Sequence, residues 1–296
     1  MSQQKAGMSC RPIMEIVMTL RPVFFLLFAC LPFIAIGSIA EAAEAPGITR
    51  SAIVVQDAEV DARMTGQARA AMERLRIAYR SAVGFSIRVS GHWTDPSGTI
   101  SPVRDSLLIA ASGDLKLLSP TRNLTLLRGV AYADSPFFPG YLIKTRVPRE
   151  LGASIATMES IWPLAPLPLE ARLRLSSSID SAFAPMLEAI GKDGVVDLSA
   201  GAWPDGTSAQ ALRFKGGETD IVVWIDPASG LVRGIRGRMA GKNGVTTIDE
   251  GRETTAVDRA PHIVIATSGR VEEPSFAALR KAWDGVYSSP LPPGGG

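Results

Sequence analysis

Apolar residues recur along the chain at two periods, and each period predicts one kind of element. From Thr65 to Ala82 the apolar positions lie three or four residues apart with arginines and glutamate between them, which is typical of an amphipathic helix. Gly84 ends this pattern. From Phe85 to Trp93 every second residue is apolar or small, which predicts a half-buried strand of an antiparallel sheet. The apolar positions that define the helix are Ala68, Ala71, Met72, Leu75, Tyr79 and Ala82.

Clusters of Gly, Pro, Asn and Asp divide most of the remaining chain into short strands. Between residues 148 and 190 the pattern changes to two weak helical stretches, near 155–162 and 183–190, which flank an apolar, proline-rich run at 162–169. A last helix is expected over 275–283. The predicted strands beyond 85–93 are 107–111, 115–118, 124–128, 130–133, 141–147, 195–198, 209–214, 219–225, 231–239, 245–250 and 262–267.

These elements predict a single α+β domain over residues 65–286. No segment repeats at a period of about 20–50 residues, so a solenoid or propeller is not indicated. Because helices do not alternate with strands, a parallel Rossmann-like sheet is excluded. The sequence therefore predicts an antiparallel sheet of roughly eleven strands packed on helices. Residues 41–64 are expected to form a flexible segment, and 287–296 a disordered tail rich in Pro and Gly.

The first forty residues have the pattern of a secretory signal peptide. The basic residues Lys5, Arg11 and Arg21 precede an uncharged, apolar stretch at 22–40, which small residues follow. We expect export to the periplasm or beyond, with cleavage near Ala40 or 42. Removal of residues 1–40 would define the mature N-terminus.

Three alternatives stay open at this N-terminal segment. The uncharged stretch approaches the ~20 residues that span a bilayer, so a retained membrane anchor is the alternative to cleavage. Cys30 follows a Leu-Phe-Ala sequence similar to a lipobox, which would allow lipidation. Met14 or Met18 as the start would shorten the basic region to an ordinary length.

Composition and charge narrow the classes of function. Apolar residues make up 46% of the chain and charged residues 20%, which is typical of a globular protein. With 31 basic and 29 acidic residues the formal charge is +2, which gives no electrostatic basis for binding nucleic acid. Cleavage after Ala40 would remove Cys10 and Cys30, so the mature domain would have no disulfide, thiolate nucleophile or cysteine-bound zinc.

Candidate catalytic residues are few. His92 alternates with Arg88 on the polar face of its strand, which indicates a surface residue, and His262 opens a predicted strand at a core or edge position. No serine-hydrolase, zinc-protease or phosphate-loop motif accompanies either histidine. The adjacent carboxylates Asp249 and Glu250 would point to opposite faces of a strand. We therefore expect no enzymatic activity, no metal and no cofactor.

The segment 224–233 reads Trp-Ile-Asp-Pro-Ala-Ser-Gly-Leu-Val-Arg, a strand, a tight turn and the start of the next strand. It resembles a hairpin of periplasmic proteins related to the lipoprotein carrier LolA, including the DUF2092 group. A helix ending at Tyr79, a strand opening at Phe85 and a hairpin at 128–132 follow the family's order, so the resemblance covers about 65–270. It implies a curved antiparallel half-barrel wrapped over helices, with an apolar cavity that holds acyl chains in LolA-like proteins.

Three features are candidate ligand-binding sites. Phe137 and Phe138 lie in a turn-rich loop before Tyr141, which predicts a cavity rim or a membrane-touching tip; a loop folded back on the core is the alternative. The run that starts at Trp162 would cover a cavity or serve as a packed connector. Arg233 alternates with apolar residues, so it would hold a head group from inside the cavity or extend to water beside the turn.

These features favour an exported binding or carrier protein for a lipid, a lipoprotein acyl chain or another hydrophobic ligand. The alternative is a non-catalytic interaction module of a cell-envelope complex, with a cavity filled by its own side chains. An enzyme comes third. The expected partners are a hydrophobic ligand or lipoprotein, with an envelope protein and peripheral membrane contact as further options and no nucleic acid.

Overall fold

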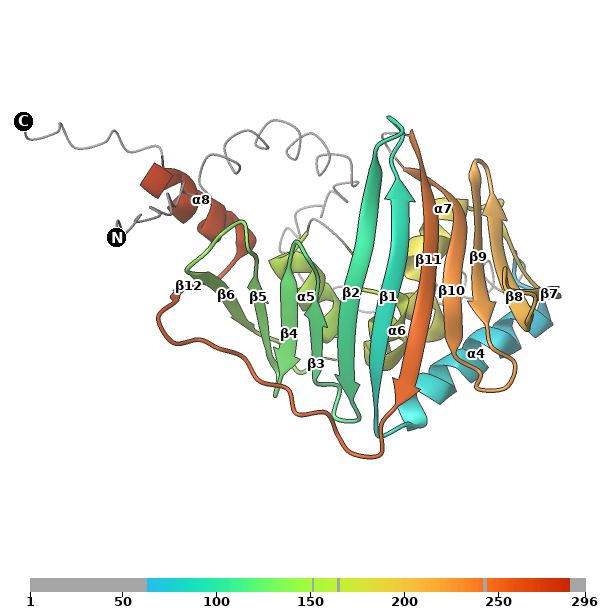
Figure 1. Cartoon of the computed structure of the whole chain (residues 1–296), viewed down its shortest axis with the longest axis horizontal. Helices are drawn as coiled ribbons and strands as arrows, with labels where there is room; N and C mark the ends of the chain where they lie inside the picture. The colour runs from blue at the N-terminus through green and yellow to red at the C-terminus, as the bar shows by residue number, and fades with distance from the viewer. Residues whose placement is uncertain (1–62, 151, 164–165, 242–243, 288–296) are drawn as a thin grey trace, which may run out of the picture.

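The computed structural model describes residues 63–287, apart from 151, 164–165 and 242–243. The predicted signal peptide, the predicted flexible segment up to residue 62 and the tail from residue 288 lie outside the described residues. The described strands form one open, curved sheet of twelve strands, with helices packed against one face (Figure 1). Of the described helices, none combines the length and the hydrophobicity needed to cross a membrane.

Within each of two groups, strands that follow one another in the chain lie side by side in the sheet. They are β1 (Gly84–Thr94), β2 (Ile100–Ala110), β3 (Leu115–Leu118), β4 (Asn123–Leu127), β5 (Val130–Asp134), β6 (Tyr141–Arg146), β7 (Val195–Ala202), β8 (Ser208–Gly216), β9 (Thr219–Ile225), β10 (Val232–Gly241), β11 (Gly244–Ala256) and β12 (Val271–Glu273). One meander runs from β1 to β6 and the other from β7 to β11, and β1 pairs with β11 to join them. These pairs are all antiparallel, whereas β12 adds to β6 in parallel, so the sheet is mixed at one edge. The predicted α+β class and the curved sheet over helices are thus confirmed.

Helices cover one face of this sheet, which we call the inner face (Figure 1). They are α4 (Gly66–Ser81), which precedes β1, and α5 (Ala153–Ile161), α6 (Leu169–Leu175) and α7 (Ile179–Ile190), which lie between the two meanders in sequence. A further helix, α8 (Phe276–Tyr287), follows β12. Alternate residues of the strands are buried beneath these helices; on β9, for example, Ile221, Val223 and Ile225 are buried while Val222 and Trp224 are half-buried. This alternation separates the inner face from the outer face.

Helix α4 forms where the apolar period predicted it. Thr65 caps it, because its hydroxyl oxygen accepts a hydrogen bond from the backbone N–H of Ala68 at 3.2 Å. The preceding residue, Met64, is buried and forms a parallel bridge with Val196 of β7. The predicted apolar stripe is the buried face of the helix, so α4 is held to the inner face along its length.

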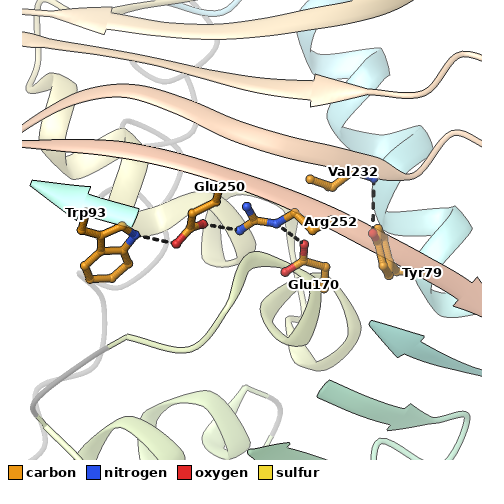
Figure 2. A network of polar contacts seen from close by, with 6 residues as sticks. All are labelled: Tyr79, Trp93, Glu170, Val232, Glu250 and Arg252. Atoms are coloured by element: carbon orange, nitrogen blue, oxygen red, sulfur yellow. Dashed lines mark hydrogen bonds and ion pairs between the residues drawn. The ribbon is translucent and has the colours of Figure 1, made fainter. Parts of the chain in front are cut away.

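Tyr79 fixes the end of α4 to the sheet. The side chain is fully buried, which raises the pKa of its phenol, and its hydroxyl oxygen accepts a hydrogen bond from the backbone N–H of Val232 at 3.3 Å (Figure 2). We expect Tyr79→Phe to lower the free energy of unfolding by about 1–2 kcal/mol, because the buried N–H of Val232 would lose its acceptor. Denaturant unfolding measures this loss, and Tyr132→Phe on the half-buried surface of β5 is the control. An equal loss in both variants would contradict the assignment.

The strand predicted at 262–267 is wrong. Residues 257–270 instead run along the ends of the strands, from β11 in the middle of the sheet to β12 at its edge (Figure 1). Ile263 is buried and Val264 is about half exposed, so the alternation that predicted a strand is present. Because the segment runs past the ends of the strands, residues 262–267 do not join the hydrogen-bond ladder of the sheet. His262, expected at a core or edge position of that strand, is exposed.

Candidate functional site

A cavity of about 130 Å³ lies between the inner face of the sheet and helices α6 and α7. Side chains from β1, β9, β10 and β11 form its sheet side, and α7 with residues 166–169 forms its helix side. Most of this wall is apolar. Its apolar lining residues include Val89, Phe183, Met186, Ile221, Ile235, Met239 and Ile248. The cavity lies between the sheet and the helices, and a ligand held there stays a prediction.

One end of the cavity is charged. Asp105 of β2, Arg122 of the β3–β4 turn and Arg172 of α6 line it together with Glu250 and Arg252 of β11. Charged side chains are rarely buried in a protein unless they are paired. None of these five residues was predicted from the sequence as a binding residue, although they form the polar part of the cavity wall.

The geometry of β11 places its charges inside. Because alternate residues of a strand face the same side, Ile248, Glu250 and Arg252 all project from the inner face. Gly91 of β1 pairs with Glu250, and it has a φ of 154°. A Cβ atom at Gly91 would come within 2.0 Å of the carbonyl oxygen of Asp249, so the close approach of β1 and β11 here requires glycine.

Arg252 lies between two carboxylates (Figure 2). Its Nε lies 2.9 Å from Oε1 of Glu170, and its Nη2 lies 2.6 Å from Oε2 of Glu250. The other oxygen of Glu250 accepts a hydrogen bond at 2.5 Å from the indole N–H of Trp93. The side chain of Arg252 is 3% exposed and that of Glu170 is fully buried. The structure thus ties β1, β11 and α6 together through one buried ionic network.

Burial and pairing shift the pKa values of these groups in opposite directions. Burial would lower the pKa of the Arg252 guanidinium, but the Glu170 and Glu250 carboxylates outweigh it and the pKa is raised. Burial lowers the pKa of Arg122 to about 10. Burial also raises the pKa of Asp105, against the opposing effect of the Arg122 guanidinium. The charged form of Arg252 is therefore favoured, whereas burial disfavours the ionised form of Asp105.

Two arginines connect the charged end to the surrounding helices. Nη2 of Arg172 lies 2.5 Å from Oε1 of Glu159 in α5, and Nη1 donates to the backbone oxygen of Ser181 at 3.0 Å. Arg122 donates to the backbone oxygen of Pro166 at 2.9 Å. These bonds hold the helix side of the cavity in place around the polar end.

Some buried polar atoms of this network have no hydrogen-bond partner among the described residues. They are Nη1 of Arg252, Nε of Arg172 and Oε2 of Glu170. A buried polar atom without a partner costs about 1–3 kcal/mol, and more when the group is charged. The side chains of Arg252 and Arg172 both line the cavity, so these N–H groups belong to its polar end.

Three of the predicted binding residues lie together, but outside the lining of this cavity. Phe138 packs edge to face against Trp162, with ring centroids 6.4 Å apart, and against Phe276 and Trp283 of α8 at 6.1 and 5.3 Å. Tyr141 packs against Trp283 at 6.0 Å. We call these five residues the aromatic cluster. Since Phe138 is half-buried within it, this part of the loop folds back on the protein, which was the alternative to a cavity rim.

Phe137 and Trp162 occupy opposite surroundings. Phe137 is 47% exposed at the tip of the β5–β6 loop, whereas Trp162 is 3% exposed. Trp162 ends α5, and residues 166–169 beyond it line the cavity. Trp162 thus belongs to the aromatic cluster, and residues 166–169 of the same run line the cavity.

Arg233 does not line the cavity, so the inward position, one of the two that the sequence left open, is not the one in the structure. A β-bulge between Val232 and Gly234 shifts the register of β10 and turns the Arg233 side chain away from the cavity. Its Nη2 lies 2.6 Å from Oδ2 of Asp205, and its guanidinium lies 5.8 Å from the ring centre of Trp203. Alternation counted along the sequence cannot reveal a bulge, because the extra residue inverts the faces.

Of the residues considered for catalysis, Glu250 lines the cavity, whereas His92, His262 and Asp249 do not. His92 and His262 are both exposed, and neither lines it. Asp249 projects from the outer face, where it pairs with Arg236 at 2.8 Å, while Glu250 faces inward. Within residues 63–287 as described, no group of three or more His, Cys, Asp or Glu side chains has the geometry to hold a metal ion.

The sheet, helices and cavity together define an open α+β half-barrel with an internal, partly charged cavity. No protein-family model matches the chain, and no curated protein does. Among solved structures it matches MucB at 12% identity over 67% of this chain, with a TM-score of 0.31. It matches the LolA superfamily protein NE2245 from Nitrosomonas europaea at 9% identity, over 64% of this chain and 94% of that one, with a TM-score of 0.28.

A putative outer membrane lipoprotein-sorting protein domain from Vibrio parahaemolyticus also matches, at 12% identity over 64% of this chain and 94% of its own, with a TM-score of 0.28. The chain spans 61% of the matched MucB chain. The LolA superfamily that the sequence resembles is therefore among the structures matched.

Proposed function

We propose that this protein is an exported binding protein for a hydrophobic ligand, which it holds in the cavity between the inner face and helices α6 and α7. The observation that carries the proposal is a mostly apolar cavity with a few convergent polar groups at one end, which is the usual composition of a small-molecule site. The apolar wall accounts for affinity, and the charged end accounts for orientation.

Binding is favoured over catalysis by the state of the polar groups. Both oxygens of Glu250 are occupied, one by Trp93 and one by Arg252. These two contacts fix the carboxylate between Trp93 and Arg252, so Glu250 has a structural role in the cavity wall. The pattern at the N-terminus, with its basic, apolar and small-residue regions, supports export to the periplasm.

A second function is favoured by the size of the cavity. Ligand pockets commonly measure about 300–1,000 Å³, and this cavity measures about 130 Å³, close to the ~150 Å³ that accepts a benzene molecule. Much of the inner face is therefore filled by side chains, as expected for an interaction module of an envelope complex. For a carrier, the same volume means that the cavity holds only one end of a ligand unless α7 moves.

Mass spectrometry under native conditions tests the two functions. The full chain is expressed in an exporting bacterial host, and the secreted product is analysed intact and after extraction with organic solvent. A copurifying lipid at near-stoichiometric amount supports the binding protein. A protein that carries no lipid and also fails to bind fluorobenzene, a benzene-sized uncharged probe followed by ¹⁹F NMR, favours the interaction module.

A bulky residue at the cavity wall provides the matching mutational test. Met186 of α7 lines the cavity and is half-buried, so Met186→Trp can fill it without forcing an indole into the tightest part of the core. We expect at least a tenfold loss of fluorobenzene affinity in this variant. Val222→Trp, on the outer face of β9 beside the cavity-lining Ile221, is the control and keeps the affinity. Unchanged binding in Met186→Trp would place the ligand elsewhere.

A further inference from the structure

The charged end of the cavity has hydrogen-bond donors that no described residue accepts. Within the described part of the chain, Nη1 of Arg252 and Nε of Arg172 have no partner, and both side chains are at least nine-tenths buried at the cavity wall. A guanidinium N–H in such a place is satisfied by an oxygen acceptor brought in from outside, either a water or a ligand. A ligand that matches these donors is therefore an apolar molecule with an oxygen acceptor at one end.

The charges around these donors decide what kind of oxygen fits. Arg252 is already neutralised by two carboxylates, Glu170 and Glu250. Arg172 is paired with Glu159, and Arg122 is influenced by both Asp105 and Glu159. Three guanidinium groups thus face four carboxyl groups, three of them paired with arginine at 2.5–2.9 Å. A ligand carboxylate or phosphate would add a further negative charge to a buried site with no uncompensated positive charge, which is strongly unfavourable.

We propose that the cavity selects an uncharged carbonyl group, an acyl ester or amide, and discriminates against the free carboxylate of the same chain. The carbonyl oxygen accepts a hydrogen bond from Nη1 of Arg252, and the adjoining carbons pack on Ile235, Met239 and Ile248. A volume of about 130 Å³ has room for the carbonyl and the first few carbons. This inference rests on the proposed binding function and names the class of ligand that the site takes.

Methyl hexanoate and hexanoate, which share one chain and differ in charge, test the selection. Each is titrated at neutral pH into the ¹⁵N-labelled secreted protein, and binding is followed at the indole N–H of Trp93, assigned with Trp93→Phe. This N–H donates to Glu250 beside the proposed carbonyl position. We expect methyl hexanoate to bind at least tenfold more tightly than hexanoate. The signal of a ¹³C-labelled ester carbonyl is expected to shift downfield on binding, because the carbonyl oxygen accepts a new hydrogen bond.

A substitution that removes one charge and nearly keeps the side-chain shape locates the origin of the preference. Glu250→Gln removes one negative charge next to Arg252 and leaves the positive charge partly uncompensated. Hexanoate is therefore expected to bind more tightly, and the preference for methyl hexanoate is expected to fall below about threefold. Asp249→Asn is the matched control, because this neighbouring carboxylate lies on the outer face with Arg236. It is expected to keep the wild-type preference. Thermal unfolding by circular dichroism verifies that both variants are folded.

The outcomes separate this inference from the proposed function. If hexanoate binds as tightly as methyl hexanoate, or more tightly, the binding function stands and the selection is overturned. If the preference exists but Asp249→Asn weakens it as much as Glu250→Gln does, the selection does not arise at Arg252 and the inference fails. If neither ligand binds and no lipid copurifies, both proposals are overturned. The wild-type comparison alone decides the selection even if Glu250→Gln does not fold.

Discussion

Arg252→Ala is expected to lower the free energy of unfolding by about 3–5 kcal/mol, which is a large part of the stability of a typical domain. The substitution removes the positive charge between Glu170 and Glu250 and leaves two buried carboxylates close to each other without a counterion. The cost arises mainly from those unpaired charges and much less from the lost contacts of the arginine itself.

A triple variant distinguishes this cause from a simple packing defect. Arg252→Met combined with Glu170→Gln and Glu250→Gln removes all three charges and keeps approximately the original volumes, so most of the lost stability is expected to return. Arg213→Ala is the surface control, since its partner Asp220 is also on the solvent side of the sheet, and it should cost less than about 1 kcal/mol. Guanidinium unfolding curves measure each variant. A triple variant as unstable as Arg252→Ala would show that the network contributes by packing.

The outline of the fold was predictable because most elements satisfy a simple period. Helix α4 and strand β1 each bury one face against the core and expose the other, so that their apolar residues alternate with polar ones as expected. Strands β3 and β9 lie within the predicted residues for the same reason. The two meanders therefore follow from the sequence without reference to tertiary contacts.

Helix α6 was missed because its charged residues are not on a solvent-exposed face. Glu170, Arg172 and Arg174 are all buried, so the alternation of charged and apolar residues that marks a surface helix has no meaning there. Arg174 donates to the backbone oxygens of Tyr79 and Ala82 at the end of α4 and to that of Ala110 in β2. A short helix whose polar groups are satisfied by other elements cannot be recognised from its own sequence.

The charged end of the cavity was hidden for a related reason. Glu250 and Arg252 alternate with Ile248 on β11, so a face that carries a buried isoleucine also carries two charges. That combination was the available signal, but it becomes informative only once Glu170, 82 residues away from Arg252, is known to lie opposite. The loop at Phe137 and Phe138 shows the opposite case. Two aromatic residues in a turn-rich loop predicted a binding site, whereas Phe138 packs against α8.

The second large effect is expected for Phe183→Ala. Phe183 is fully buried in α7, stacks on Phe214 with ring centroids 5.6 Å apart and forms part of the cavity wall. Its truncation removes apolar contacts and leaves empty space, which together cost about 3–5 kcal/mol. Because that space joins the existing cavity, the variant would contain one enlarged cavity in contact with Ile221 and Phe214.

An enlarged cavity should accept ligands more readily, and this separates Phe183→Ala from an ordinary core defect. Fluorobenzene is expected to raise the melting temperature of Phe183→Ala more than that of the wild type, since a ligand that binds only the folded state stabilises it in proportion to its affinity. Leu117→Ala is the matched control, because Leu117 is equally buried in β3 but does not line the cavity. Leu117→Ala should lower the free energy of unfolding by about 2–5 kcal/mol, and fluorobenzene should raise its melting temperature much less than that of Phe183→Ala. Equal rescue of both variants would mean that the probe enters any void, whereas rescue of Phe183→Ala alone would show that the cavity beneath α7 is the accessible one.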